Sequence, residues 1–160
     1  MKDKIVYIAL SVDILHHGHI NLIEQAKKYG TVVAGLLSDK AIATHKRMPL
    51  LNFNQRKKIL ENISGISKVV VQNEWDYSKN IIKIKPNYMV HGDDWKFGKD
   101  KNLRKKTIQT LKNIGAKLIE IPYTKNISSF SMQERIYSDG LTLSGRQLIL
   151  KRLLQIKNMT

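Results

Sequence analysis

The chain has 160 residues, of which 42% are hydrophobic; this predicts one folded domain with a real core and excludes a disordered chain. It has no cysteine, which excludes disulfides and thiolate metal sites. The formal net charge is +15, but the lysines are spread over nearly every segment, which favours solvated helix surfaces over a nucleic-acid-binding arm or a membrane-binding surface.

The N-terminal stretch MKDKIVYIAL contains an apolar run that is too short for a signal peptide. No window of the sequence approaches the length of a membrane span. We therefore expect a cytoplasmic protein. The positive field would also speed the arrival of a small polyanionic substrate.

Runs rich in β-branched residues alternate with helical patterns along the chain. They predict strands at residues 4–10, 31–38, 68–72, 87–92 and 117–123. They predict helices at residues 18–29, 54–64, 78–84, 102–114 and 131–137. This alternation predicts an α/β fold: a Rossmann-like, doubly wound parallel sheet of about five strands with helices on both faces.

We expect residues 1–140 to form this domain. Residues 141–160 would form a helical extension, because their apolar positions follow a helical period. The extension would pack on the domain or on a partner subunit; a helix lying on a membrane surface is the alternative.

Ligands of such folds bind outside the carboxyl ends of the strands. Four polar loops are predicted at that edge of the sheet: SVDILHHGH, SDKAIATHKRMP, HGDDWKFG and PYTKNISSF. The functional residues should therefore be found in these four loops.

The first loop carries His16 and His19, three residues apart, with Gly18 between them. At the start of a helix both rings should share a face and point past the N-terminus, whose free N–H groups attract anions. Gly18 would let a phosphate approach the backbone, and His17 should point away. A zinc site with Asp13 as a third ligand, or a polar helix start without function, are the alternatives. The position after the first strand favours phosphate chemistry.

The stretch SVDILHHGHINLI resembles the signature of the HxGH nucleotidyltransferase superfamily. NQRKKILENI is similar to the arginine-bearing helix of its cytidylyltransferase branch, HGDDW to that branch's GDDW loop, and NISS to its GIST or GISS segment. The stretches GLLSDKAIATHKRMPLL, KPNYMVHGDDWK and IEIPYTKNISS look most like the phosphonate cytidylyltransferases associated with phosphoenolpyruvate mutase. Glycerol-3-phosphate cytidylyltransferases resemble the chain more distantly. The matches run in order from Asp13 to Ser129.

This resemblance implies an enzyme that transfers CMP from CTP to a small phosphonate and releases pyrophosphate. It implies 2-aminoethylphosphonate as the acceptor, then 2-hydroxyethylphosphonate, and Mg²⁺ as cofactor. We also expect a homodimer, no specific nucleic-acid partner and no membrane partner. The alternatives are glycerol-3-phosphate or phosphocholine as the acceptor, an adenylyltransferase of the same superfamily, and a basic nucleic-acid-binding module without catalysis.

The resemblance also implies residue roles. His16, His19 and Lys46 would be catalytic, the histidines as hydrogen-bond donors to the triphosphate and Lys46 as a point charge on phosphate oxygens. Arg56 could anchor a phosphate bidentately, and Asp94 could hold Mg²⁺ together with Asp93. The nucleotide-binding residues would be Ser11, Val12, Asp13, Gly18, Arg56, His91, Gly92, Asp94, Tyr123, Ile127, Ser128 and Ser129.

Three positions bear on how far the resemblance holds. Asn126 replaces the family's glycine before IS, and asparagine tolerates a left-handed conformation better than most residues. Phe130 replaces a threonine, which removes one hydroxyl. Tyr123 stands where the glycerol-3-phosphate branch has an arginine, and the phosphonate branch shares the tyrosine.

Trp95 offers an aromatic surface to a ligand, although packing explains a tryptophan equally well.

Overall fold

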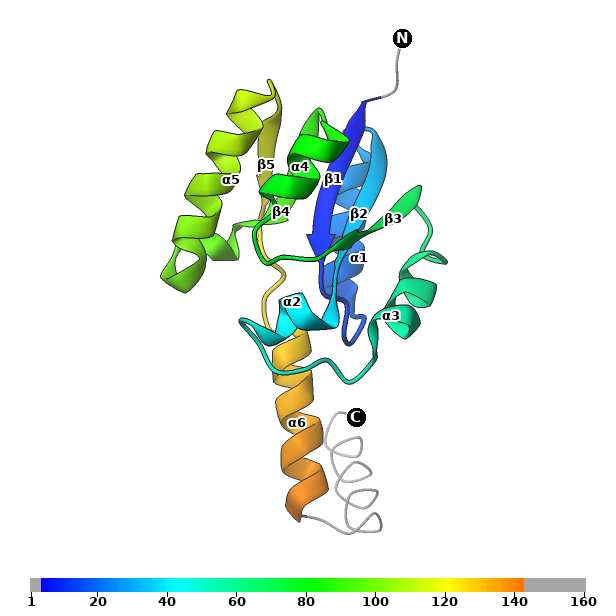
Figure 1. Ribbon diagram of the computed structural model, residues 1–160. Coiled ribbons are helices and arrows are strands. Elements are labelled where there is room, and N and C mark those ends of the chain that lie inside the picture. Colours follow the sequence, from blue (N-terminus) through cyan, green and yellow to red (C-terminus); the bar gives the residue numbers. More distant parts are fainter. Residues whose placement is uncertain (1–3, 143–160) are drawn as a thin grey trace. The chain divides into compact units, whose positions relative to one another are not determined.

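The computed structural model describes residues 4–142 of the chain. The chain divides into two compact units, of which the first ends at Asn126 and the second begins at Ile127. The first unit contains a single sheet of five parallel strands, so the predicted Rossmann-like α/β fold is confirmed (Figure 1). The strands are β1 (Ile5–Leu10), β2 (Thr31–Leu37), β3 (Lys68–Gln72), β4 (Tyr88–Gly92) and β5 (Lys117–Ile121).

The strand order is β3-β2-β1-β4-β5. Strand β1 is therefore central, and Val6 is paired with Val32 of β2 on one side and with Tyr88 of β4 on the other. Strands β2 and β3, which follow β1 in the sequence, lie on one side of it. Strands β4 and β5, which come later, lie on the other side. The switch point of the sheet thus lies between β1 and β4, where such folds bind ligands.

Helices cover both faces of the sheet, as predicted. The longer helices of the first unit are α1 (His17–Lys27), α3 (Phe53–Leu60), α4 (Ser78–Ile84) and α5 (Lys101–Asn113). Helices α1 and α3 cover one face, and α4 and α5 cover the other (Figure 1). Ile8 packs in a core with residues of α1 and α3, and Tyr7 packs with residues of α4 and α5. Successive residues of a strand point to opposite faces, so β1 supplies both cores and is buried on both sides.

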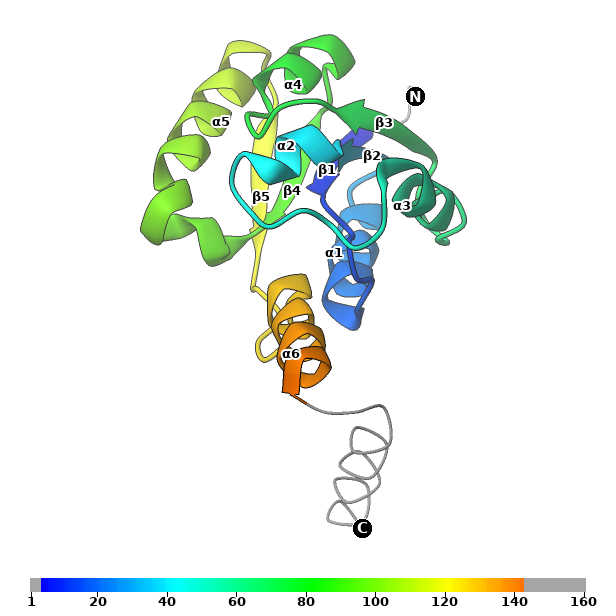
Figure 2. The same ribbon diagram turned by 60° about the horizontal axis from the view of Figure 1, so that its bottom comes forward.

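The predicted bounds agree closely with the structure for most elements. Strand β3 and helix α4 coincide with the predicted ranges residue for residue. Three short helical segments are absent from the prediction: α2 (Asp39–Ala43), η1 (Asp93–Lys96) and η2 (Gly98–Asp100). Segments of five residues or fewer are too short to show a helical period in the sequence. Figure 2 shows α2 and the segment after it lying across the carboxyl end of the sheet.

The second unit contains helix α6 (Ser129–Thr142). Ser128 caps its start, since its hydroxyl accepts a hydrogen bond from the backbone N–H of Ser131 at 3.0 Å. Before it, at the end of the first unit, Asn126 has a φ of +63°, so the asparagine adopts the left-handed conformation that was expected of it. Residues 143–160, most of the predicted C-terminal extension, lie outside the described residues. Within residues 4–142, none of the helices has the length and apolar run needed to cross a membrane.

Candidate active site

The structure brings His16 and His19 together and sets His17 apart. The ring centroids of His16 and His19 lie 3.8 Å apart, with 38° between the ring planes. The ring of His17 is exposed, and its centroid is 6.4 Å from that of His16. His16 itself precedes the helix in an extended conformation, so the shared-face argument from helical spacing was wrong in detail. The pair is joined instead by the backbone N–H of His16, which donates to Nδ1 of His19 at 3.3 Å.

This hydrogen bond defines the protonation of His19. Because Nδ1 accepts, the proton of the neutral ring lies on Nε2 and is available to a ligand. Burial, together with the neighbouring charges of His16 and Lys46, lowers the pKa of His19 from 6.5 to about 3. Burial also lowers the pKa of His16, with a smaller contribution from His17. The pair can therefore donate hydrogen bonds at neutral pH without carrying charge.

Gly18 makes room for the first histidine. A Cβ at this position would lie 3.0 Å from Cε1 and Nδ1 of His16, and 3.4 Å from Cβ of Thr124. The space left by the glycine is thus taken by the imidazole, where the sequence analysis expected a phosphate. Nδ1 of His16 is buried and makes no hydrogen bond within the described part of the chain.

Lys46 lies in the segment between α2 and α3 and supplies positive charge to the site. Its Nζ is 5.2 Å from the ring centroid of Trp75. Burial of the ammonium group lowers the pKa of Lys46, and the carboxylates of Asp100 and Asp94 partly offset this effect. The charge of Lys46 in turn helps to lower the pKa of His19, which puts the cation near the histidine pair.

The segment between β1 and the histidines is strained. Val12 is fully buried and has a φ of +47°, which is an outlier for a β-branched residue. Asp13 is also buried, and its Oδ1 accepts a hydrogen bond from the backbone N–H of Leu51 at 3.1 Å. The carboxylate of Asp13 thus ties the histidine loop to the segment that carries Lys46.

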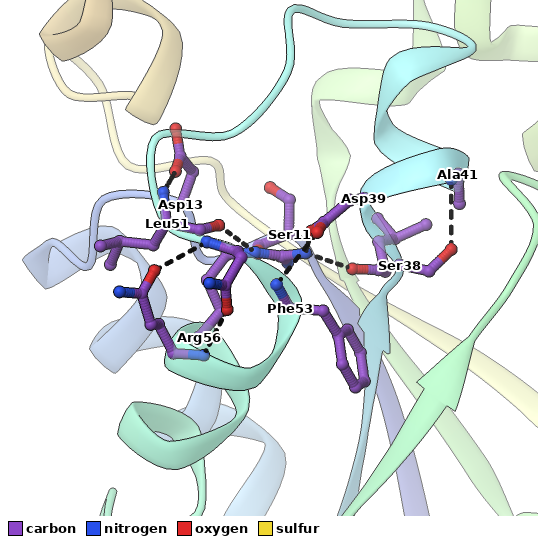
Figure 3. A network of polar contacts seen from close by, with 11 residues as sticks. Ser11, Asp13, Ser38, Asp39, Ala41, Leu51, Phe53 and Arg56 are labelled. Carbon is purple, nitrogen blue, oxygen red and sulfur yellow. Dashed lines mark hydrogen bonds and ion pairs between the residues drawn. The ribbon is translucent and has the colours of Figure 1, made fainter.

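The guanidinium of Arg56, which was expected to anchor a phosphate, is bound to groups of the protein itself, and the residue is not a surface arginine. Its side chain is fully buried, and each of its three guanidinium nitrogens donates to an acceptor of the protein (Figure 3). The acceptors are the backbone oxygens of Ser11 at 2.5 Å, Leu37 at 2.9 Å and Leu51 at 3.0 Å, and Oδ1 of Asp39 at 2.6 Å. Arg56 therefore joins the three segments that contain Ser11, Leu37 and Leu51. The pattern on helix α3 could not reveal this, because the acceptors come from distant segments.

The end of β4 brings His91, Gly92 and the two aspartates to the same edge. The ring of His91 stacks on Trp95 at 3.7 Å, and its Nδ1 lies 2.7 Å from the backbone oxygen of Gly92. This carbonyl can only accept, so Nδ1 is the protonated nitrogen of a neutral ring; burial lowers the pKa of His91. A Cβ at Gly92 would lie 2.9 Å from Oδ1 of Asp94. A side chain at position 92 would therefore push the carboxylate of Asp94 away from its present place at the strand end.

The aromatic residues of this region differ in role. Trp95 is buried, and its Nε1 donates to Oε1 of Glu120 at 2.8 Å. Its role is therefore packing in the core, and it does not offer an aromatic surface to a ligand. Tyr123 is 43% exposed, and its ring lies close to Gly92. Burial, with a smaller contribution from Asp94, raises the pKa of Tyr123. The phenol of Tyr123 is thus neutral, and the side chain is partly exposed to solvent beside the end of β4.

The carboxylates do not form a closed metal site. Across residues 4–142, no three histidine, aspartate or glutamate side chains are grouped so that they could hold a metal ion. Asp13 accepts from Leu51, and Oδ1 of Asp93 accepts from the backbone N–H of Tyr123 at 2.9 Å. Asp94 is exposed, and its role as a magnesium ligand stays a prediction.

Three of the expected nucleotide-binding residues belong to the second unit: Ile127, Ser128 and Ser129. The hydroxyl of Ser128 is engaged in capping α6. Their role toward a nucleotide stays a prediction. Trp75, Asp100 and Thr124 were not expected near the site, since each comes close to it only through the tertiary fold.

Residues 11–135 match the family described as cytidylyltransferase-like. The chain is 30% identical over 138 residues to the glycerol-3-phosphate cytidylyltransferase of Bacillus subtilis, covering 85% of this chain and 98% of that protein. It is 31% identical over 99 residues to an FAD synthase of Archaeoglobus fulgidus, covering 60% of this chain and 72% of the relative. These relatives establish the family but not its phosphonate branch.

Among solved structures, a lipopolysaccharide core biosynthesis protein from Thermoplasma volcanium aligns with a TM-score of 0.65 and 24% identity. The alignment covers 77% of this chain and 99% of that chain, and at this identity it supports the fold alone. The family match, the near full-length relative and the position of the histidine pair at the switch point agree. The chain belongs to the cytidylyltransferase-like family and is a nucleotidyltransferase.

Proposed function

We propose that the protein transfers CMP from CTP to a small phosphonate and releases pyrophosphate. The observation that carries this proposal is the pair of neutral imidazoles, His16 and His19, next to the positive charge of Lys46 at the start of α1. Neutral N–H donors, a cation and a helix N-terminus together suit a triphosphate whose α-phosphorus gains charge in the transition state.

The reaction needs no dedicated base. The second ionisation of a phosphate-like group has a pKa of about 6, so the acceptor oxygen is already a nucleophile at neutral pH. That oxygen would form a bond to the α-phosphorus of CTP, while the bond from this phosphorus to the bridging oxygen of pyrophosphate breaks. His19 would donate from Nε2 to a phosphate oxygen, and Lys46 would offset the charge of two anions brought together.

Magnesium is the proposed cofactor, and Asp94 is the residue that would contribute a ligand to it. When bound, the ion would supply further positive charge to the triphosphate. The homodimer and the cytoplasmic location stay predictions.

We propose CTP as the nucleotide because of how much of this chain and of each relative is aligned. The alignment with the glycerol-3-phosphate cytidylyltransferase covers 85% of this chain and 98% of that protein, whereas the alignment with the FAD synthase covers 60% of this chain and 72% of that protein. The second candidate function, adenylyl transfer, is favoured by the similar identity of the FAD synthase. For the acceptor we favour 2-aminoethylphosphonate, then 2-hydroxyethylphosphonate, then glycerol-3-phosphate or phosphocholine.

A pyrophosphate-release assay of ATP, CTP, GTP and UTP against these four acceptors tests both choices. We expect release with CTP, at the highest kcat/KM with a phosphonate. His19→Ala serves as the control that the release comes from this site. Equal turnover with ATP would favour the adenylyl alternative, and release with CTP only in the presence of glycerol-3-phosphate would overturn the phosphonate acceptor.

A further inference from the structure

Trp75 lies in the loop between β3 and α4 and contacts two consecutive residues of the segment between α2 and α3. The imidazole of His45 stacks on its ring, with centroids 4.6 Å apart and 8° between the planes. Nζ of Lys46 lies 5.2 Å from the same ring. The indole is therefore a common contact surface for the residue that carries the charge of the site and for its neighbour.

The indole is itself held in place. Its Nε1 donates to Oδ1 of Asp100 at 3.3 Å. Next to Asp100, Nζ of Lys99 donates to the backbone oxygen of His45 at 3.4 Å. Asp100 thus binds the indole of the stacked pair, and Lys99 binds the backbone of His45, whose imidazole is the other ring of the pair.

The turn that carries Trp75 is built on a buried amide. Gln72, at the end of β3, is 2% exposed, and its Nε2 donates to the backbone oxygens of Glu74 at 2.7 Å and Asp76 at 2.9 Å. These carbonyls belong to the two residues that flank Trp75. Oε1 of Gln72 accepts from the hydroxyl of Tyr7 in β1 at 2.6 Å, so the turn is anchored to the central strand.

Residues 44–48 are exposed as whole residues, although the backbone N–H groups of His45 and Lys46 both donate to the backbone oxygen of Ile42. The ammonium group of Lys46 lies at the end of a long side chain and packs against the Trp75 ring. A lysine side chain can adopt many rotamers, and misplacing a reacting group by about 1 Å can cost on the order of 100-fold in rate. An aromatic face attracts an ammonium group and restricts where it lies.

We propose that Trp75 is a positioning residue that holds Lys46 beside the histidine pair, and that Gln72 fixes the turn from which it does so. This inference rests on the proposed function, because it assumes that Lys46 acts on the triphosphate. Trp75 then contributes to the rate only through Lys46, and its removal should lower kcat more than it raises KM for the nucleotide.

A double-mutant cycle on kcat tests this proposal, using the full chain and the best nucleotide and acceptor of the wild type. We expect Trp75→Leu to lower kcat by about 10- to 100-fold, the range expected for misplacing one charged group. In a Lys46→Ala background the same change should cost less than about threefold, since the group that it positions is gone. Equal losses in both backgrounds would overturn the proposal, because a general structural role acts whether or not Lys46 is present.

Two further variants keep the result clear. Trp75→Phe keeps an aromatic face for Lys46 and loses only the bond to Asp100, so it should retain most of kcat; a phenylalanine variant as impaired as the leucine variant would contradict the role of the ring. Tyr29→Leu is the matched control, because Tyr29 pairs with Tyr88 at 5.6 Å near the amino ends of the strands. It should leave kcat unchanged, whereas a loss equal to that of Trp75→Leu would contradict a specific role for Trp75.

The failure of the proposed function would look different. In that case the wild type would release no pyrophosphate with any acceptor, or Lys46→Ala would be fully active. The positioning role fails when the wild type is active and depends on Lys46, but the two substitutions act independently.

Discussion

Nη2 of Arg56 lies 2.6 Å from Oδ1 of Asp39, and the arginine side chain of this ion pair is wholly shielded from solvent. Three further hydrogen bonds from the same guanidinium reach the backbone at Ser11, Leu37 and Leu51 (Figure 3). One side chain thus joins the ends of β1 and β2 to the start of α3. The loops that carry His16 and Lys46 are held by this buried charge.

We predict that Arg56→Ala destabilises the fold strongly. The substitution leaves the hydrogen bonds to three carbonyl oxygens unmade, while Asp39, whose side chain is 32% exposed, keeps the backbone N–H of Phe53 as a donor. Because unpaired buried acceptors cost about 1–3 kcal/mol each, we expect a loss of about 3 kcal/mol or more. Urea unfolding followed by circular dichroism would measure the loss in the free energy of unfolding.

Lys57→Ala is the matched control for this prediction. Lys57 is the next residue of α3 and pairs with Glu61 at 2.5 Å on the surface, where both side chains are 39% exposed. Its removal should change the free energy of unfolding by no more than about 0.5 kcal/mol. An Arg56→Ala protein as stable as the wild type, with only KM for the nucleotide raised, would restore the phosphate-anchor hypothesis.

The histidine pair should be essential and its neighbour dispensable. We predict that His16→Ala and His19→Ala each lower kcat by roughly 10²–10³, the scale for losing one preorganised donor. His17→Ala should cost less than about threefold, because its exposed ring lies away from the pair. Steady-state kinetics of the three variants decides this, and a His17 variant as slow as the other two would contradict the assignment.

Stability should fall on mild acidification. Burial lowers the pKa of His16, His19 and His91 in the folded protein, to about 3 for His19. Below a pH of about 6.5 the unfolded chain therefore binds protons that the folded chain does not, so the free energy of unfolding decreases as the pH falls from about 6.5 toward 3. His19 alone can contribute up to about 1.4 kcal/mol per pH unit in that window, and nothing above it.

Urea midpoints between pH 5 and pH 8 test this dependence. The wild-type curve should be level above pH 7 and slope downward below it, and a His19→Asn variant should have a shallower slope. A wild-type midpoint that is constant from pH 5 to pH 7 would show that these rings take up protons as readily in the folded state as in the unfolded chain.

Activity should depend on added magnesium. With Asp94 as the one exposed carboxylate beside the site, the purified protein should carry no tightly bound metal. We predict that EDTA abolishes pyrophosphate release and that Mg²⁺ restores it. Asp94→Asn should reduce activity more than Asp93→Asn, because an asparagine at position 93 can still accept the hydrogen bond from Tyr123. Metal analysis that finds stoichiometric zinc, lost in His16→Ala, would reverse the histidine assignment.

Much of the fold follows from local sequence patterns. Alternating β-branched runs and helical periods predicted every strand and the longer helices, because burying one face of each element imposes its own spacing on the sequence. Parallel order then brings all strand ends to one edge, so the loops with His16, Lys46 and Asp94 were expected together. The left-handed conformation of Asn126 was also predictable, because it depends on the residue type itself.

The sequence by itself therefore determined the fold class, the edge of the sheet that carries the site, and the histidine pair with its exposed neighbour. Only the tertiary structure decided which groups Arg56 and Trp75 contact and how far the pKa of His19 falls. Arg56 meets Asp39 across 17 positions and Ser11 across 45, and the pKa of His19 depends on how the folded chain excludes water. Contacts between distant segments and the desolvation that they cause leave no period or spacing in the sequence, which is why these roles appear only once the chain is folded.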